Sequence, residues 1–148
     1  MSLFKSLGIS ASGLSAERLR LDVISSNIAN ANSTQTVKGG PYRRRVALLA
    51  PQKNEEVFKN ILQDSLKNIP SYSGVRVTGI IEDSSPLKRV YDPHHPHASA
   101  DGYVEYPNVD VMKEMVELIT ASRAYEANVT ALNSTKNMFL KTLEIGRA

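Results

Sequence analysis

Apolar residues recur every seven positions through the first 30 residues of the chain. Leu7, Leu14, Leu21 and Ile28 form one row, and Ile24 occupies the complementary position of the heptad. This repeat is typical of an α-helix that presents an apolar seam to a partner helix. The glycines and serines in the stretch have little helical preference, so we expect the helix to depend on packing for its order.

A second and stronger heptad pattern begins after Asn108. We expect the Asn108 side chain to cap a helix, Asp110 to lie in its first turn, and the helix to run to about Ile145 and end at Gly146. Eight of the ten seam positions are apolar. The a positions are Met115, Ser122, Val129, Lys136 and Leu143, and the d positions are Val111, Leu118, Tyr125, Leu132 and Phe139.

The predicted C-terminal helix is too long for a globule of this size to wrap. About 35 residues at 1.5 Å each give a helix of about 50 Å, which must project and needs a partner for its seam. The alternative is a compact bundle within one monomer, which the few apolar residues of the middle region disfavour. Further apolar residues off the seam favour contacts with other subunits. They are Met112, Val116, Ile119 and Leu140.

The region between the two helices has a different pattern. Small amide and hydroxyl residues should end the first helix near Asn30 to Asn32, because they compete for backbone hydrogen bonds. Strands are expected at residues 42–50 and 74–81, with a third at 87–91 and a short helix at 55–66. The fold class predicted is mainly α, a coiled-coil-like hairpin of terminal helices with a small β-rich insertion. The helical core would comprise residues 1–35 and 107–148, and the β-rich region residues 36–106.

Composition narrows the classes of function. The chain has 148 residues, a formal charge of +3 and no cysteine, which excludes disulfides, thiolate metal sites and cysteine nucleophiles. The N-terminus lacks a basic segment followed by an apolar run, so we expect no cleaved secretory signal. No stretch reaches the about 18 apolar residues of a membrane span, and direct membrane insertion is not expected.

Most of the basic excess lies in Arg43, Arg44 and Arg45. The three residues fall on a predicted strand, where at most two can share a face. A solvated edge strand or a salt-bridge patch between subunits explains them better than a phosphate site. No nucleic-acid-binding motif accompanies them, and nucleic acid is not an expected partner.

One histidine cluster resembles a metal site. His94, His95 and His97 lie near Asp92 and Asp101, and such ligands could hold zinc or nickel. The segment is a proline-punctuated loop without a rigid support, so a solvated loop is the better interpretation. The serines lack a nucleophile motif and no carboxylate pair is evident, so we expect no catalytic residue, cofactor or resident metal.

Three asparagines close the first helix. Asn27, Asn30 and Asn32 are spaced by three and two residues. Such a run suits a helix end, and it could equally form hydrogen bonds across subunits. The pattern does not separate these two uses.

Both ends of the chain resemble a known family. The stretches Gly8-Ile-Ser-Ala-Ser-Gly-Leu-Ser-Ala and Leu21-Asp-Val-Ile-Ser-Ser-Asn-Ile-Ala-Asn-Ala-Asn resemble the N-terminal signature of bacterial flagellar rod and hook proteins. Tyr106-Pro-Asn-Val-Asp-Val, Ala121-Ser-Arg-Ala-Tyr-Glu-Ala-Asn-Val and Thr142-Leu-Glu-Ile-Gly-Arg resemble its C-terminal signature. The signature residues carried by this chain are Asn27, Asn30, Asn32, Pro107, Asn108, Arg123, Tyr125, Glu126 and Asn128.

The resemblance implies a structural subunit of the proximal rod, the axial shaft that transmits torque. It implies copies of itself and other rod proteins as partners, export through the flagellar type III apparatus, and a place in the periplasmic part of the basal body. Contacts that do not close would build a helical tube. The alternatives are a module that binds peptidoglycan or another anionic partner through its basic strand, and, less favoured, a metal-dependent hydrolase at the histidine loop.

Overall fold

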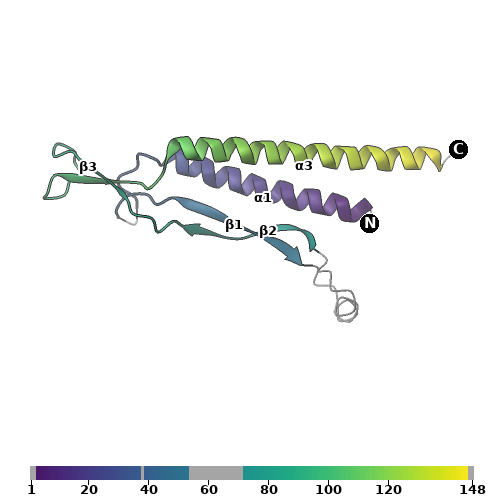
Figure 1. Ribbon diagram of the computed structural model, residues 1–148, viewed down its shortest axis with the longest axis horizontal. Helices are drawn as coiled ribbons and strands as arrows, with labels where there is room; N and C mark the ends of the chain where they lie inside the picture. Colours follow the sequence, from purple (N-terminus) through teal and green to yellow (C-terminus); the bar gives the residue numbers. More distant parts are fainter. Residues whose placement is uncertain (1–2, 38, 54–71, 147–148) are drawn as a thin grey trace.

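The computed structural model describes residues 3–37, 39–53 and 72–146. Its body is an elongated layer of two long helices, α1 (Leu3–Ala29) and α3 (Val111–Ile145), with a β-hairpin beneath them (Figure 1). Helix α1 contacts α3 on one side and the hairpin on the other. Two helices with small antiparallel sheets between them in the sequence match the predicted class.

The first helix ends where the amide-rich segment begins, as predicted. Its last turn is closed by the Asn30 side chain, which donates to the Ser26 carbonyl oxygen at 2.9 Å. The backbone then turns, with Ser33 donating to the Asn30 carbonyl oxygen at 3.1 Å. This amide bonding ends the helix because it replaces the hydrogen bonds that another helical turn would supply.

Strands β1 (Arg45–Lys53) and β2 (Tyr72–Glu82) form the antiparallel hairpin. The predicted 74–81 strand is therefore present, whereas the first strand begins later than the expected residue 42. The hairpin is fixed to α1 through Ser12, whose hydroxyl accepts from the Val75 N–H at 3.1 Å and donates to the Ile9 carbonyl at 2.7 Å. Gly74 has a φ of +124° beside Ser12, so a larger residue would be strained there. The predicted helix at 55–66 lies outside the described residues.

A second, smaller sheet lies at the opposite end of the molecule from the chain termini (Figure 1). Strand β3 (Lys88–Tyr91) pairs antiparallel with β4 (Tyr103–Tyr106). The third predicted strand is thus confirmed, whereas the sequence pattern gave no prediction of β4. One aromatic contact accompanies the strand pairing, with the Tyr91 and Tyr103 ring centroids 5.3 Å apart.

The prediction that Asn108 caps the second helix is wrong. Asp110 is the N-cap, and its carboxylate accepts from the backbone N–H groups of Met112 at 3.1 Å and Lys113 at 3.5 Å. Asn108 is used elsewhere because its amide reaches neighbouring loop segments. The predicted end is confirmed, since α3 finishes at Ile145 with Gly146 as its C-cap.

Small and polar residues line the contact between α1 and α3. On α3 the residues turned toward α1 are Glu114, Ala121 and Thr135, which are buried. At Gly13 of α1 the helices come so close that an added Cβ would lie 3.0 Å from Oδ1 of Asn128. The helices can approach to this extent because neither contributes a large side chain at this level.

The predicted d positions of the seam lie on the face of α3 that contacts α1. Leu118, Tyr125, Leu132 and Phe139 are half-buried on that side. The a positions are mixed: Met115 is 49% and Leu143 50% exposed, whereas Ser122 and Val129 are half-buried. The inner row is one residue earlier in the heptad than the apolar pattern indicated.

Candidate assembly interface

A buried polar cluster joins the helices to the β-rich region at Asn27, near the end of α1. The Asn27 side chain is 0% exposed. Its amide nitrogen donates to the Arg45 carbonyl oxygen at 2.8 Å and to Glu114 Oε2 at 2.9 Å. Its amide oxygen accepts from the Tyr42 hydroxyl and from the Arg45 N–H, both at 2.9 Å. All four hydrogen-bonding positions of the amide are therefore used.

Glu114 supplies the charge at the centre of this cluster and is the largest fully buried side chain among the described residues. Its Oε1 accepts from Arg44 Nε at 2.6 Å, a short charge-assisted hydrogen bond. Arg44 also reaches Glu117 Oε1 at 3.1 Å and lies 3.8 Å from Asp83 Oδ2. A buried carboxylate is tolerated here because both its oxygens are hydrogen-bonded and a guanidinium neutralises it.

The pKa of Arg44 reflects two opposing effects. Burial lowers the pKa of its guanidinium and is the largest single influence. The hydrogen bond and charge of Glu114, together with the charges of Glu117 and Asp83, outweigh burial and leave the pKa above its ordinary value. Arg44 is consequently a fixed cation.

Asn108 connects the same cluster to the segment that follows β2. Its side-chain oxygen accepts from the Arg44 N–H at 2.8 Å, and its nitrogen donates to the carbonyl oxygens of Asp83 and Ser85 at 3.2 and 3.3 Å. The hydroxyl and N–H of Ser85 donate to Asp83 Oδ1, and these bonds hold the pKa of Asp83 below its ordinary value. We call Asn27, Tyr42, Arg44, Asn108 and Glu114 the polar node.

The polar node corrects the expectation for the arginine run. Arg44 precedes β1 and forms its ion pairs within the chain, so it belongs neither to a solvated strand nor to a patch between subunits. Arg45 pairs with Glu82 at 3.5 Å and lies 5.7 Å from the centre of the Tyr42 ring. Only Arg43 is exposed without a described ion pair, which weakens the case for an anion-binding strand.

The seam residues of α1 lie on the sides of the helix that meet its neighbours. Ile24 is buried, and Leu7, Leu14, Leu21 and Ile28 are half-buried. On α3, Val129 is half-buried and Val111 is 40% exposed.

The signature residues divide into internal and external positions. Pro107 is fully buried, and Asn128 donates to the Ala124 carbonyl oxygen at 2.9 Å beside Gly13. The exposed, external positions are Asn32, in the turn after α1, and Arg123 and Glu126 on α3. The internal residues support this chain's own fold, whereas the external ones remain available to a neighbour.

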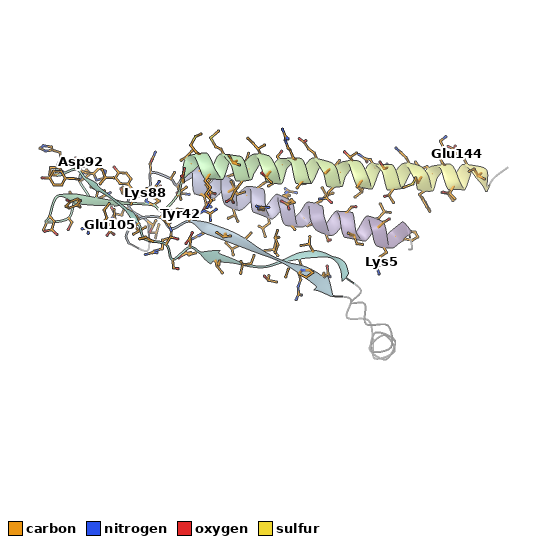
Figure 2. The ribbon with its side chains drawn as sticks, viewed as in Figure 1. Lys5, Tyr42, Lys88, Asp92, Glu105 and Glu144 are labelled. Carbon is orange, nitrogen blue, oxygen red and sulfur yellow. The ribbon has the colours of Figure 1, made fainter. Side chains whose placement is uncertain are left out.

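The outward side of α3 carries a cluster of exposed large apolar side chains in its first three turns. We call Met112, Met115, Val116 and Ile119 the α3 apolar row; Met112 is 73% and Val116 63% exposed. Figure 2 shows side chains of α3 standing out along the side that faces away from α1. Contiguous apolar surface of this kind marks an interaction site in a soluble protein.

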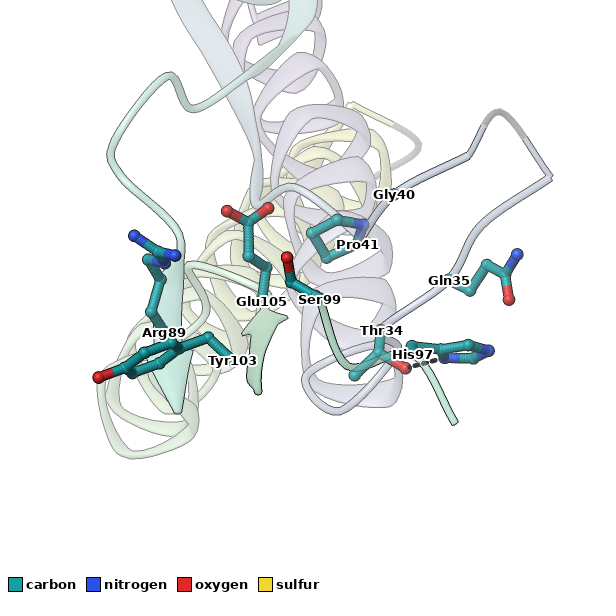
Figure 3. A pocket seen from close by; sticks show the side chains of 9 residues that line it. All are labelled: Thr34, Gln35, Gly40, Pro41, Arg89, His97, Ser99, Tyr103 and Glu105. Carbon is teal, nitrogen blue, oxygen red and sulfur yellow. Dashed lines mark hydrogen bonds between the residues drawn. The ribbon is translucent and has the colours of Figure 1, made fainter. Parts of the chain in front are cut away.

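The histidine loop packs against the turn after α1. His97 Nδ1 lies 2.9 Å from Thr34 Oγ1, drawn as a dashed line in Figure 3, and His95 Nδ1 accepts from the His97 N–H at 3.1 Å. The loop borders an open cavity of about 420 Å³ that includes Arg89 and Tyr103. Within residues 3–37, 39–53 and 72–146 no group of three histidine or acidic side chains is placed to hold a metal. The same residues contain no helix long and apolar enough to span a membrane.

Two family models match the chain at its helical ends. The model described as "Flagella basal body rod protein" covers residues 7–35, and the model described as "Flagellar basal body rod FlgEFG protein C-terminal" covers residues 100–145. These ranges contain the Asn27 and Glu114 ends of the polar node and the whole α3 apolar row. The matched segments are thus those that build the helical body.

Curated proteins from other bacteria are similar to this chain over nearly their whole length. The flagellar basal-body rod proteins FlgC of Borreliella burgdorferi and Bacillus subtilis are each 49% identical, with 98% and 99% of this chain and 98% and 100% of theirs aligned. The FlgC protein of Salmonella typhimurium is 40% identical, with 99% of this chain and all of that protein aligned.

Proposed function

This chain belongs to the FlgC family of flagellar basal-body rod proteins, and from that premise we propose that it joins the rod through the apolar seam residues of its two terminal helices. The chain is a structural subunit of the basal-body rod that assembles with other rod components, and it is not an enzyme. The observation that carries the proposal is the exposure of large apolar side chains along α3, which a soluble monomer leaves in contact with water.

The helical core is proposed to comprise residues 1–35 and 107–148 and to pack as a coiled-coil-like hairpin. Contact between α1 and α3 along their length supports it, from Asn27 with Glu114 at one end to Phe4 with Phe139 at the other. The remaining residues, 36–106, would form the β-rich region. Long packed helices resist shear collectively, which suits a shaft that transmits torque.

The proposed assembly interface is the set of seam residues given by the heptads. Val111, Met115 and Leu143 support it most directly, because they are 40%, 49% and 50% exposed. Half-buried members would contribute edges of their side chains, and Ile24 would act by holding α1 in place.

We further propose export through the flagellar type III apparatus, without a cleaved signal, to the periplasmic part of the rod. The contact between α1 and α3 contains glycine, alanine, asparagine and threonine, and the large apolar residues of α3 on that side are only half-buried, so the isolated hairpin leaves part of its apolar surface exposed. A weakly held hairpin unfolds readily for passage and gains order from neighbours in the polymer. Nucleic acid is not a proposed partner, because the charge of Arg44 is neutralised internally.

A matched pair of lysine substitutions tests the assembly role. In a strain lacking the native gene, Leu143→Lys places a charge on a proposed interface residue, and Asn137→Lys places one on an exposed polar position of the same helix. We expect Leu143→Lys to abolish motility and to be missing from purified basal bodies, while Asn137→Lys assembles normally. Normal incorporation of Leu143→Lys would contradict the proposal.

A further inference from the structure

A groove lies where α1, β1 and the start of α3 meet. Its volume is about 230 Å³. Its apolar wall includes Val46, Leu48 and Leu49, and its charged rim includes Arg20 and Glu117. Leu48 is 43% and Leu49 39% exposed, so the wall is open to water. We call this feature the β1 groove.

The β1 groove and the α3 apolar row lie on opposite flanks of the helical layer. Glu114 points toward α1 and marks the inward direction of α3. At 100° per residue, Glu117 of the groove rim lies about 60° to one side of Glu114, and Met115 lies about 100° to the other side. A convex apolar surface and a concave one therefore face away from each other on one molecule.

We propose that the α3 apolar row of one copy docks into the β1 groove of a second copy of this chain. The inference rests on the proposed assembly function and specifies the surfaces that meet. One chain carries both halves of the contact, so a second copy supplies the missing half without another protein. Row packed against row would close a dimer and stop growth, whereas row against groove leaves a free row and a free groove for the next copy.

Charge is consistent with the same pairing. The groove rim carries Arg20 and Arg45, whose side chains are 32% and 46% exposed. Glu126 lies one heptad beyond Ile119 and is exposed on the same face of α3 as the apolar row. Docking of the row would bring this carboxylate to a groove lined by both guanidinium groups, which pair within the chain with Glu17 at 3.8 Å and Glu82 at 3.5 Å but stay partly exposed.

The absence of cysteine makes the contact accessible to a direct test. Cells lacking the native gene would express two tagged alleles, Met115→Cys and Leu49→Cys, and their purified basal bodies would be treated with a short thiol-to-thiol cross-linker. The control pairs Leu49→Cys with Thr130→Cys, which lies further along the outward face of α3. A second pair, Ile119→Cys with Leu48→Cys, is used if either first variant fails to assemble.

We expect a cross-linked species carrying both tags only when the row and groove alleles are present together. A dimer from Met115→Cys alone would show row-to-row packing and overturn the inference. Basal bodies that contain both alleles but give no mixed dimer, or that link these cysteines to a different rod protein, would also overturn it while leaving the rod function intact. If basal bodies form normally but contain none of the four cysteine variants, that result would instead contradict the proposed function.

Discussion

Removing the charge of Glu114 leaves the Arg44 guanidinium buried beside a neutral amide. In Glu114→Gln, the new NH2 group must also face one of two donors, the Asn27 nitrogen or Arg44 Nε. Breaking a buried pair in this way should lower the free energy of unfolding by about 3 kcal/mol. Glu117→Gln, at a partly exposed partner of Arg44, should cost less than about 1 kcal/mol. Urea unfolding followed by circular dichroism measures both, and equal losses would argue against a central role for Glu114.

The stability of the folded chain should depend on pH through the titration of Asp83. Hydrogen bonds from Ser85 hold its pKa in the folded chain below the ordinary 3.8, so the unfolded chain binds a proton more readily. The stability that these bonds provide is therefore complete above the ordinary pKa and is lost as pH falls through the folded value. Thermal midpoints of the native chain and Asp83→Asn should differ most above about pH 5 and converge as pH falls below 3.8. A difference that stays constant with pH would assign the effect to something other than titration.

Individual residues were harder to assign from the sequence than elements. Asn27 was singled out, but its two possible uses could not be separated because its partners Arg45 and Glu114 are far away in the chain. Glu114 was missed altogether. A carboxylate on the face of α3 that turns toward α1 was a usable signal, since such a residue needs a buried cation and the arginine run offered one.

At the scale of elements, the N-cap of α3 contributes to the stability of the chain independently of the polar node. Asp110→Ala removes the acceptor for the N–H groups of Met112 and Lys113 and should destabilise the chain by about 1 kcal/mol. Asp110→Asn keeps an oxygen in the same place and should lose only a few tenths. Thermal unfolding at neutral pH compares them. Equal behaviour of the two variants would mean that charge near the helix end, rather than the hydrogen bonds, is important.

The C-terminal ends of both helices followed from local chemistry and were predicted correctly, whereas the residue that caps the start of α3 was not. The amide-rich segment ended α1, and Gly146 ended α3, because both effects act over a few residues. The β4 strand was not predicted, since Tyr103–Tyr106 is short and its pairing with β3 is decided by the intervening loop. The row of α3 residues that lies closest to α1 also differs from the predicted one. Apolarity suggested Met115, whereas the inner row consists of residues such as Ala121 and Thr135 that permit close helix contact.

At the scale of the whole molecule, α3 extends past its partner. Phe139 contacts Phe4 near the start of α1, and the residues from Leu140 to Ile145 are all exposed. Hydrogen exchange followed by mass spectrometry should therefore find fast exchange after residue 139 in the purified chain, and slow exchange around Asn27. Assembly into basal bodies should slow exchange in the C-terminal turns. Strong protection of those turns in the isolated chain would indicate that they already have a partner.

The polar node joins the beginning of the chain to its end, and this has a consequence for the timing of folding. Asn27 leaves the ribosome, or any narrow conduit, long before Glu114 does, and 87 positions separate them. Contacts between such distant segments form slowly, because the intervening chain must first be closed into a loop. Until the last third of the polypeptide has emerged, the first helix has no carboxylate to satisfy its asparagine. Delayed closure of this kind would keep the chain extended during passage through a narrow conduit, as the proposed export requires.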